Sequence, residues 1–266
     1  MTTRVAIAGA TGRMGRMLLE ALSESECTLA AALERADSPH IGKDAQAFGY
    51  REQGILLRPD LAAALAASEV LIDFTRPEGT LAHLAACRAA KKPIVIGTTG
   101  FDDAGKTAIA MAAKDISVVF APNMSVGVNI TLKLIEQAAR ALDADYDIEI
   151  VEMHHNQKVD APSGTALKMG EVAAAARGTS LAAEGVLSRE GHTGARKRGA
   201  IGFATLRGGD VIGDHTVIFA GGGERIEISH KSSTRGNYAK GAIKAARWLA
   251  GKPPGLYDMQ DVLGLK

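Results

Sequence analysis

The chain has 266 residues, of which 46% are hydrophobic, enough apolar material for one large or two modest domains with buried cores. Its 31 basic and 30 acidic side chains leave a net charge of +1, so no strong field favours nucleic acid or an anionic membrane. Cys27 and Cys87 lie far apart outside any CxxC pattern, which favours reduced, buried thiols over a disulfide or a metal site.

The amino terminus runs directly into an apolar strand, without the charged region, apolar stretch and cleavage site of a signal peptide. No apolar run approaches the ~20 residues that a membrane-spanning helix needs. We therefore expect a soluble, cytoplasmic protein.

Up to about residue 120, short apolar runs alternate with alanine-rich amphipathic stretches at the spacing of successive βαβ units. The pattern predicts strands over residues 4–8, 28–34, 70–74, 93–97 and 117–121, and helices over 14–22, 60–67, 77–90 and 102–113. Continuously apolar strands suit a parallel sheet covered on both faces, so the predicted fold class is α/β with a doubly wound, Rossmann-type sheet. Residues 36–59, rich in glycine and polar groups, are predicted to form a long, mobile connection.

After residue 123 the pattern changes to a helix over 126–142, a strand over 147–153 and a second helix from about Gly164. Further strands are predicted over 201–206, 216–220 and 225–229, which indicates a smaller α+β domain built on a mixed sheet. The last helix, over 237–249, is expected to return to the first domain. The predicted domains are residues 1–125 plus 235–266, which bind a dinucleotide, and residues 126–234, which bind the substrate.

Glycines follow the first strand at the spacing Gly9, Gly12 and Gly15. Glycine at this turn leaves backbone N–H groups and a helix N-terminus open to a pyrophosphate, although a tight turn is the simpler alternative. The second strand ends in Glu34, near the offset at which an acid binds the adenosine ribose, and Arg35 follows. An acid repels a 2′-phosphate and an arginine pairs with it, so the pair predicts that both NADH and NADPH are accepted, unless it is only a solvated strand end.

A second glycine- and threonine-rich turn, residues 97–100, follows another predicted parallel strand. Ligands of such sheets gather at the carboxyl ends of the strands, which favours a cofactor contact here over a loop without function.

The most informative segment is residues 152–166, where His154, His155 and Lys158 precede a predicted helix N-terminus. Ser163 is the predicted N-cap, which leaves the Gly164 and Thr165 amides available to a carboxylate. A histidine titrates near neutrality and a lysine supplies positive charge or a proton, so the segment predicts anion binding with proton transfer.

Two other interpretations of the paired histidines stay open. They could be structural, or they could bind a metal ion together with residues such as His192, Glu152 or Asp160. Adjacent strand residues point to opposite faces, which disfavours both histidines binding one ion, and no metal is predicted. The basic run 196–198 has little aromatic company and is predicted to be a solvated, flexible loop that binds no nucleic acid.

Several segments together resemble one known family. They are residues 5–9 with 12–15, 73–79, 97–101, 123–129 and 154–166, of which the last ends in the very specific run Asp-Ala-Pro-Ser-Gly-Thr-Ala. The chain resembles, over nearly its whole length, the 4-hydroxy-tetrahydrodipicolinate reductase family, also called dihydrodipicolinate reductase, of bacterial lysine and diaminopimelate synthesis. Many relatives have glycine where Thr11 stands here.

The resemblance implies that His154 and Lys158 are the catalytic proton donors or acceptors and that His155, Gly164 and Thr165 hold the substrate. It implies cofactor contacts from Gly9, Ala10, Thr11, Gly12, Arg13, Met14, Glu34, Arg35, Gly97, Thr98, Thr99, Ala121, Pro122, Asn123 and Met124. It also implies a homotetramer joined through the sheet of the second domain, and a hinge that closes the domains on both ligands.

Two alternative functions remain open. One is another two-domain nicotinamide dehydrogenase, although an acylating semialdehyde enzyme would need a nucleophilic cysteine near the paired histidines. The other is an NAD(P)H-sensing protein that binds the cofactor without chemistry, for which Lys158 would be unnecessary.

Overall fold

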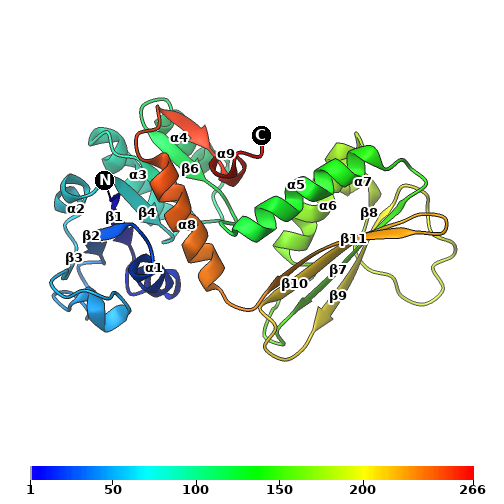
Figure 1. Ribbon diagram of the computed structural model, residues 1–266, viewed down its shortest axis with the longest axis horizontal. Coiled ribbons are helices and arrows are strands. Elements are labelled where there is room, and N and C mark those ends of the chain that lie inside the picture. Colours follow the sequence, from blue (N-terminus) through cyan, green and yellow to red (C-terminus); the bar gives the residue numbers. More distant parts are fainter. Residues whose placement is uncertain (1) are drawn as a thin grey trace. The chain divides into compact units, whose positions relative to one another are not determined.

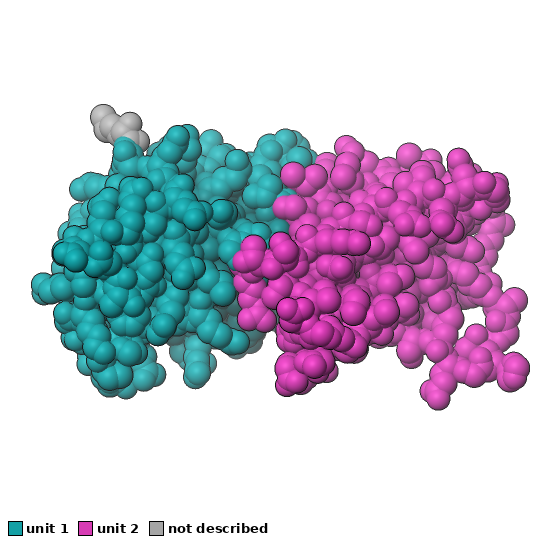
Figure 2. Space-filling model, turned by 60° about the horizontal axis from the view of Figure 1, so that its bottom comes forward, with its two compact units in different colours: residues 1–126, 236–266 teal, residues 127–235 magenta. Residues whose placement is uncertain are grey.

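The structure is a computed structural model that describes residues 2–266, and the chain divides into two compact units (Figure 2). Unit 1 combines the residues up to Val126 with Gly236–Lys266, and unit 2 is Gly127–Arg235. The chain therefore passes from unit 1 into unit 2 and back again.

Unit 1 contains a seven-stranded sheet in which every paired strand is parallel. Its strands are β1 (Arg4–Ala8), β2 (Thr28–Leu33), β3 (Leu57–Arg58), β4 (Val70–Asp73), β5 (Ile94–Ile96), β6 (Ser117–Phe120) and β12 (Gly255–Tyr257). The order β12-β6-β5-β4-β1-β2-β3 reverses between β1 and β4 (Figure 1). Ligands of open parallel sheets bind outside the carboxyl ends of the strands at such a reversal.

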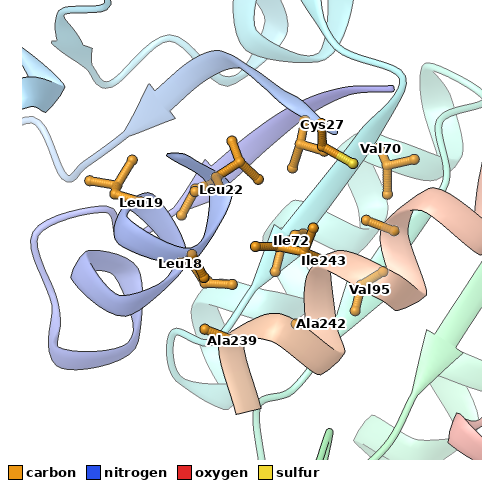
Figure 3. Close-up of a cluster of buried hydrophobic side chains, with 14 of the residues drawn as sticks. Leu18, Leu19, Leu22, Cys27, Val70, Ile72, Val95, Ala239, Ala242 and Ile243 are labelled. Carbon is orange, nitrogen blue, oxygen red and sulfur yellow. The ribbon is translucent and has the colours of Figure 1, made fainter. Parts of the chain in front are cut away.

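Helices cover both faces of this sheet. They are α1 (Arg13–Ser23), α2 (Leu61–Ala67), α3 (Pro77–Ala89), α4 (Asp103–Ala112), α8 (Gly236–Leu249) and α9 (Met259–Leu263). On one face α1 and α8 bury Leu18 and Ile243 against Ile72 of the sheet (Figure 3). On the other, α3 and α4 bury Leu84 and Ile109 in a separate cluster. The prediction of a doubly wound parallel sheet is confirmed.

The segment between β2 and β3 differs from its prediction as a mobile connection. It contains a 3-10 helix, η1 (Ala45–Phe48), and buries Phe48 and Tyr50, together with Leu57 of β3, in the core that α1 also contacts. The Asp44 carboxylate accepts hydrogen bonds from two backbone amides of the segment and so fixes its path. The prediction gave too much weight to the polar residues and too little to the few aromatic and aliphatic ones that anchor them.

Unit 2 contains a mixed five-stranded sheet in the order β11-β10-β7-β9-β8, as predicted for the second domain. Its elements are α5 (Val126–Ala141), β7 (Asp147–His154), α6 (Gly164–Ala176), α7 (Leu181–Glu184), β8 (Gly185–Val186), β9 (Ile201–Arg207), β10 (Gly213–Ala220) and β11 (Arg225–Ser232). Strand β10 is antiparallel to β7 and β11, whereas β7 and β9 are parallel.

Side chains alternate strictly along β7 and β10 between a buried face and a partly exposed one. On the buried face, Ile148 and Ile150 of β7 pack with Val217 and Phe219 of β10 against apolar residues of α5 and α6. The next residues of β7 in the same alternation are Glu152 and His154, and both are buried. The alternation therefore places polar groups at the end of an apolar strand face.

Within the basic run 196–198, Lys197 and Arg198 are exposed, as predicted, whereas Arg196 is held by several contacts and differs from the prediction of a solvated loop. The Arg196 guanidinium is 21% exposed and binds the carboxylates of Asp147 and Glu149 as well as three backbone carbonyls. Lys197 pairs with Glu184, and Arg198 pairs with an aspartate before β7. The acidic partners come from other elements, which a local reading of the charge run could not identify.

None of the helices formed by residues 2–266 is both long enough and apolar enough to span a membrane.

Candidate active site

The turn after β1 leaves the N-terminus of α1 open. Gly9 adopts a positive φ of 67°, and Gly12 caps the helix without any side-chain hydrogen bond. A side chain at Gly15 would put its Cβ 2.2 Å from the Gly9 carbonyl oxygen, so close packing of helix on turn requires glycine there. No acidic residue occupies the first turn of α1. This backbone arrangement suits a pyrophosphate, because N–H groups and the helix dipole both favour an anion.

Glu34, just after β2, lies against the same turn. Its Oε2 accepts hydrogen bonds from the Thr11 hydroxyl (2.5 Å) and the Thr11 amide (3.2 Å). The Arg35 amide donates to Oε1, whereas the Arg35 guanidinium pairs with Asp37 (2.9 Å) on the surface. The structure thus brings the predicted acid to the glycine-rich turn and places the predicted phosphate-binding arginine in a solvent-exposed ion pair.

The loop after β5 is held in place through hydrogen bonds that begin at Asp73, the last residue of β4. The buried Asp73 carboxylate contacts the hydroxyls of Thr75 (2.7 Å) and Thr80 (3.1 Å) and His83 Nδ1 (2.6 Å). Thr80 in turn hydrogen-bonds the buried Thr98 hydroxyl at 2.8 Å. Burial alone would raise the pKa of Asp73, but the His83 contact and the threonine hydrogen bonds outweigh it and hold the pKa below its ordinary value.

The loop after β6 turns its apolar side chains inward. Ala121 and Met124 are buried in the core, while Pro122 is exposed and Asn123 is half-buried. The backbone carbonyl of Met124 packs against α8 at Gly241, where a Cβ would lie only 1.8 Å from the oxygen. The predicted cofactor residues therefore lie on loops at the carboxyl ends of β1, β2, β5 and β6 in one sheet, or, for Arg13 and Met14, in the first turn of α1, as ligand binding at such a sheet requires.

In unit 2, His154 ends β7 with its ring held by a carboxylate. His154 Nδ1 lies 2.6 Å from Glu152 Oε2, and both side chains are buried. Burial lowers the pKa of His154 below its ordinary value, and the opposing effect of the Glu152 charge does not cancel this shift. Above pH 6.5 the ring is therefore neutral, and a neutral ring that donates from Nδ1 keeps Nε2 as an acceptor.

Glu152 has further partners on two other elements. Arg207 of β9 forms a fork with both carboxylate oxygens, each N–O distance being 2.9 Å, and the Ser163 amide donates to Oε1 at 3.1 Å. Burial alone would raise the pKa of Glu152, but hydrogen bonds from Arg207 and His154 lower it below its ordinary value. Glu152 is therefore a carboxylate at neutral pH, and an adjacent guanidinium makes it a poor metal ligand.

His215 of β10 lies beside this group. Its Nε2 is 2.9 Å from the Ser163 hydroxyl, and its ring meets the His154 ring edge-on at a centroid distance of 5.1 Å. Burial, with a smaller contribution from the charge of His154, lowers the pKa of His215 to about 4. At physiological pH the His215 ring that packs against His154 is therefore neutral.

Lys158 lies in the loop that leaves β7. Its ammonium binds both carboxylate oxygens of Asp160 at 2.7 and 2.9 Å, and this contact lowers the pKa of Asp160. The loop is tied to the β9–β10 turn, because the His155 amide donates to the Val211 carbonyl at 2.7 Å. The peptide bond before Pro162 is cis.

Helix α6 begins where the sequence predicts. The Ser163 hydroxyl accepts a hydrogen bond from the Ala166 amide (3.1 Å), which confirms the predicted N-cap. Gly164 is exposed and Thr165 half-buried, and the first turn carries no acid. The N-terminus of α6 can therefore receive a carboxylate beside the histidine and the lysine.

Sequence reasoning did not assign roles to Glu152, Arg207, His215 or Asp73, apart from considering Glu152 as a metal ligand. A signal was present for two of them, because Glu152 and Asp73 each occupy an apolar position of a buried strand. Arg207 and His215 reach the site by strand pairing across more than 50 residues, which leaves no local pattern.

Comparison with known families adds an independent finding. Residues 3–124 match the family described as dihydrodipicolinate reductase, N-terminus, and residues 127–263 match dihydrodipicolinate reductase, C-terminus. The second match includes α8, which belongs to unit 1 in the structure.

Relatives of the chain carry a consistent name. A 4-hydroxy-tetrahydrodipicolinate reductase of Cupriavidus taiwanensis is 62% identical over 98% of this chain and 99% of its own length. A protein of the same name from Nitrosospira multiformis is 59% identical over 100% of this chain and 99% of its own. Among solved structures, a dipicolinate-bound dihydrodipicolinate reductase from Paenisporosarcina sp. TG-14 superposes with a TM-score of 0.78 at 26% identity, covering 98% of this chain and 99% of its own. The chain belongs to the dihydrodipicolinate reductase family.

Proposed function

We propose that the protein is a 4-hydroxy-tetrahydrodipicolinate reductase that reduces the derived cyclic imine dicarboxylate to tetrahydrodipicolinate, in lysine and diaminopimelate synthesis. The observation that carries the proposal is 62% identity over 98% of the chain to a relative of that name, together with the cluster of His154, Lys158 and the α6 N-terminus in unit 2.

The cofactor contacts are proposed for the loops at the carboxyl ends of the unit 1 strands. The turn Gly9 to Met14 would hold the pyrophosphate, and Glu34 would bind the adenosine ribose. The loops 97–99 and 121–124 would contact the nicotinamide end. When bound, the nicotinamide supplies the hydride. Because Glu34 and Arg35 both lie at the ribose end, NADH and NADPH are both proposed to be accepted.

The substrate is proposed to bind in unit 2 through its carboxylates. The Gly164 and Thr165 amides at the start of α6 would hold one carboxylate, with His155 beside them. The Lys158 ammonium adds the positive charge that a doubly negative substrate needs.

Reduction of the imine also consumes a proton, which we assign to His154 or Lys158. Above pH 6.5 the lowered pKa leaves His154 neutral, so in that range Lys158 is the favoured donor and His154 Nε2 accepts a hydrogen bond. Below that range a protonated His154 can donate from Nε2.

The decisive experiment follows NADH absorbance when the condensation product of pyruvate and aspartate semialdehyde is supplied with and without the protein. We expect enzyme-dependent oxidation of NADH. Lys158→Ala and His154→Ala should each lower kcat by ~10²–10⁴, the usual worth of general acid catalysis, and should leave the Kd for NADH unchanged. Full activity of both variants would exclude the assigned roles, and absence of activity in the unaltered protein would favour a cofactor-sensing protein.

We also propose a cytoplasmic homotetramer assembled through the outer face of the unit 2 sheet. That face carries Val151 and Met153 of β7, Leu206 of β9 and Ile218 of β10, and Leu206 is 44% exposed. Such a row of apolar side chains on a sheet face favours burial against a second copy. Light scattering should give four times the mass of one chain, and Leu206→Lys should reduce that mass; a monomer at micromolar concentration would refute the assembly.

A further inference from the structure

We infer that Glu152 is the central positioning residue of the proposed substrate site: one buried carboxylate fixes the ring of His154, the loop of Lys158 and the N-terminus of α6. The inference rests on the proposed function, because it concerns how that site is held. It goes beyond the residues assigned to the reaction, since Glu152 would touch neither substrate nor cofactor.

The first connection fixes the orientation of His154. Glu152 and His154 are two residues apart on β7, so both side chains project from the same face of the strand. The 2.6 Å contact between Oε2 and Nδ1 requires the proton of a neutral His154 to reside on Nδ1. Nε2 is then the nitrogen available to a substrate, and the ring cannot turn without breaking a charge-assisted hydrogen bond.

The second connection reaches Lys158 through Arg207. The Arg207 fork binds both Glu152 oxygens, and its Nη2 also donates to the Asp160 backbone carbonyl at 2.6 Å. The Asp160 carboxylate in turn binds the Lys158 ammonium. Glu152 therefore determines where Arg207 stands, and Arg207 determines where the loop presents Lys158.

The third connection reaches α6. The Ser163 amide donates to Glu152 Oε1, and the Ser163 hydroxyl caps the helix whose next residues are Gly164 and Thr165. His154, Lys158 and the α6 amides lie on a strand, a loop and a helix of one local motif, and contacts that begin at a single buried carboxylate connect all three. Glu149, three residues earlier on β7, also pairs with two arginines but projects from the opposite face of the sheet and makes none of these contacts.

The test compares Glu152→Gln with Glu149→Gln, the same change on the same strand. Histidine Cε1–H signals are titrated by NMR, and kcat and NADH affinity are measured at pH 7.5. Burial lowers the pKa of His154, Glu152 of β7 raises it, and the charges of Lys158 and Arg207 lower it, while the ring of His215 lies against the ring of His154. Glu152→Gln should therefore lower the pKa of His154 further and lower kcat by ~10- to 100-fold, with the Kd for NADH unchanged.

Arg207→Met should shift the pKa of His154 in the opposite direction from Glu152→Gln. Removing the guanidinium should raise the pKa of His154 while kcat still falls, because Lys158 loses its anchor. A role in stability alone would lower activity and melting temperature in both variants without moving the His154 pKa in opposite directions. Glu149→Gln should leave the pKa of His154 unchanged and kcat within twofold of the value for the unaltered protein.

The unaltered protein gives a check that needs no variant. Nitrogen-15 shifts of His154 above pH 7 should show a proton on Nδ1 and none on Nε2; the reverse tautomer would overturn the inference, even if Glu152→Gln proves unable to fold. An active unaltered enzyme whose His154 pKa and kcat are indifferent to Glu152→Gln would also overturn it. An inactive unaltered protein with the expected tautomer would instead count against the proposed function.

Discussion

At the scale of single residues, Gly213 leaves the space in which the His154 ring sits. A Cβ at Gly213 would lie 3.0 Å from His154 Nε2 and 3.5 Å from His215 Cε1, while the glycine has no positive φ that would itself exclude alanine. Gly213→Ala should therefore displace the ring and lower kcat by ~10- to 100-fold, the cost of misplacing a reacting group by a fraction of an ångström to 1 Å. Steady-state kinetics checks this, with Gly222→Ala as control, because nothing lies within 4 Å of a Cβ there. Equal kinetics for the two variants would contradict it.

Arg35 is the residue expected to distinguish the two cofactors. Its guanidinium pairs with Asp37 at the surface, so it must leave that partner to bind a 2′-phosphate. Arg35→Ala should weaken NADPH binding by about 1–3 kcal/mol and NADH binding by less, whereas Asp37→Ala should strengthen NADPH binding by freeing the arginine. Titration of cofactor fluorescence measures both Kd values, and equal losses for NADH and NADPH in Arg35→Ala would refute the pairing.

At the scale of elements, α8 depends on one glycine for its contact with the loop after β6. Alanine is the better helix former by about 1 kcal/mol, but at Gly241 its Cβ would lie 1.8 Å from the Met124 carbonyl oxygen. We expect Gly241→Ala to lower the free energy of unfolding by about 2 kcal/mol or more and to weaken NADH binding, because the displaced loop is a proposed cofactor contact. Urea unfolding followed by the fluorescence of Trp248, the single tryptophan, measures the loss. Lys244→Ala, on the exposed side of α8, should have little effect.

The elements also show how far the sequence could predict the structure. Long amphipathic helices have a strong period and the strands of the parallel sheet are distinct apolar runs, so their predicted bounds differ from the structure by only one or two residues, whereas β10 and β11 each extend three residues beyond their predicted ranges. The short elements η1, β3, α7, β8, β12 and α9 have too few residues to show a period, and tertiary contacts decide them. In the site, His154, Lys158 and Ser163 lie in one local motif and were predictable. Strand pairing places Arg207 and His215 in the site, so no local pattern predicts them. The environment of Arg196 was predicted wrongly because its acidic partners are distant in sequence.

At the scale of the whole molecule, the buried histidines of unit 2 make stability depend on pH. The pKa of His215 is about 4 in the folded protein and about 6.5 when unfolded, so below pH 6.5 the unfolded chain binds the extra proton. The stability that the folded protein gains from a neutral His215 is therefore fully present above pH 6.5 and is lost as the pH falls toward 4. At 1.36 kcal/mol per pKa unit, His215 alone should lower the free energy of unfolding by about 2 kcal/mol when the pH falls from 7.5 to 5.

The measurement is urea unfolding by circular dichroism at pH 7.5 and 5, a window in which ordinary carboxylates stay ionised. The burial of His154 and His230 lowers their pKa values too, and so adds to the same trend. His215→Asn removes one titrating ring and should reduce the pH dependence. A steeper loss of stability in that variant would contradict the assignment.

The division of unit 1 into two stretches of chain has a consequence for the order in which a nascent polypeptide can fold. Unit 2 is continuous, so it can complete its sheet as soon as residues 127–235 have left the ribosome. Residues 1–126 emerge earlier but lack Ala239, Ala242 and Leu249 of α8, which fill the core over β4 and β5. The first 126 residues must therefore keep this apolar surface uncovered until α8 has also been translated.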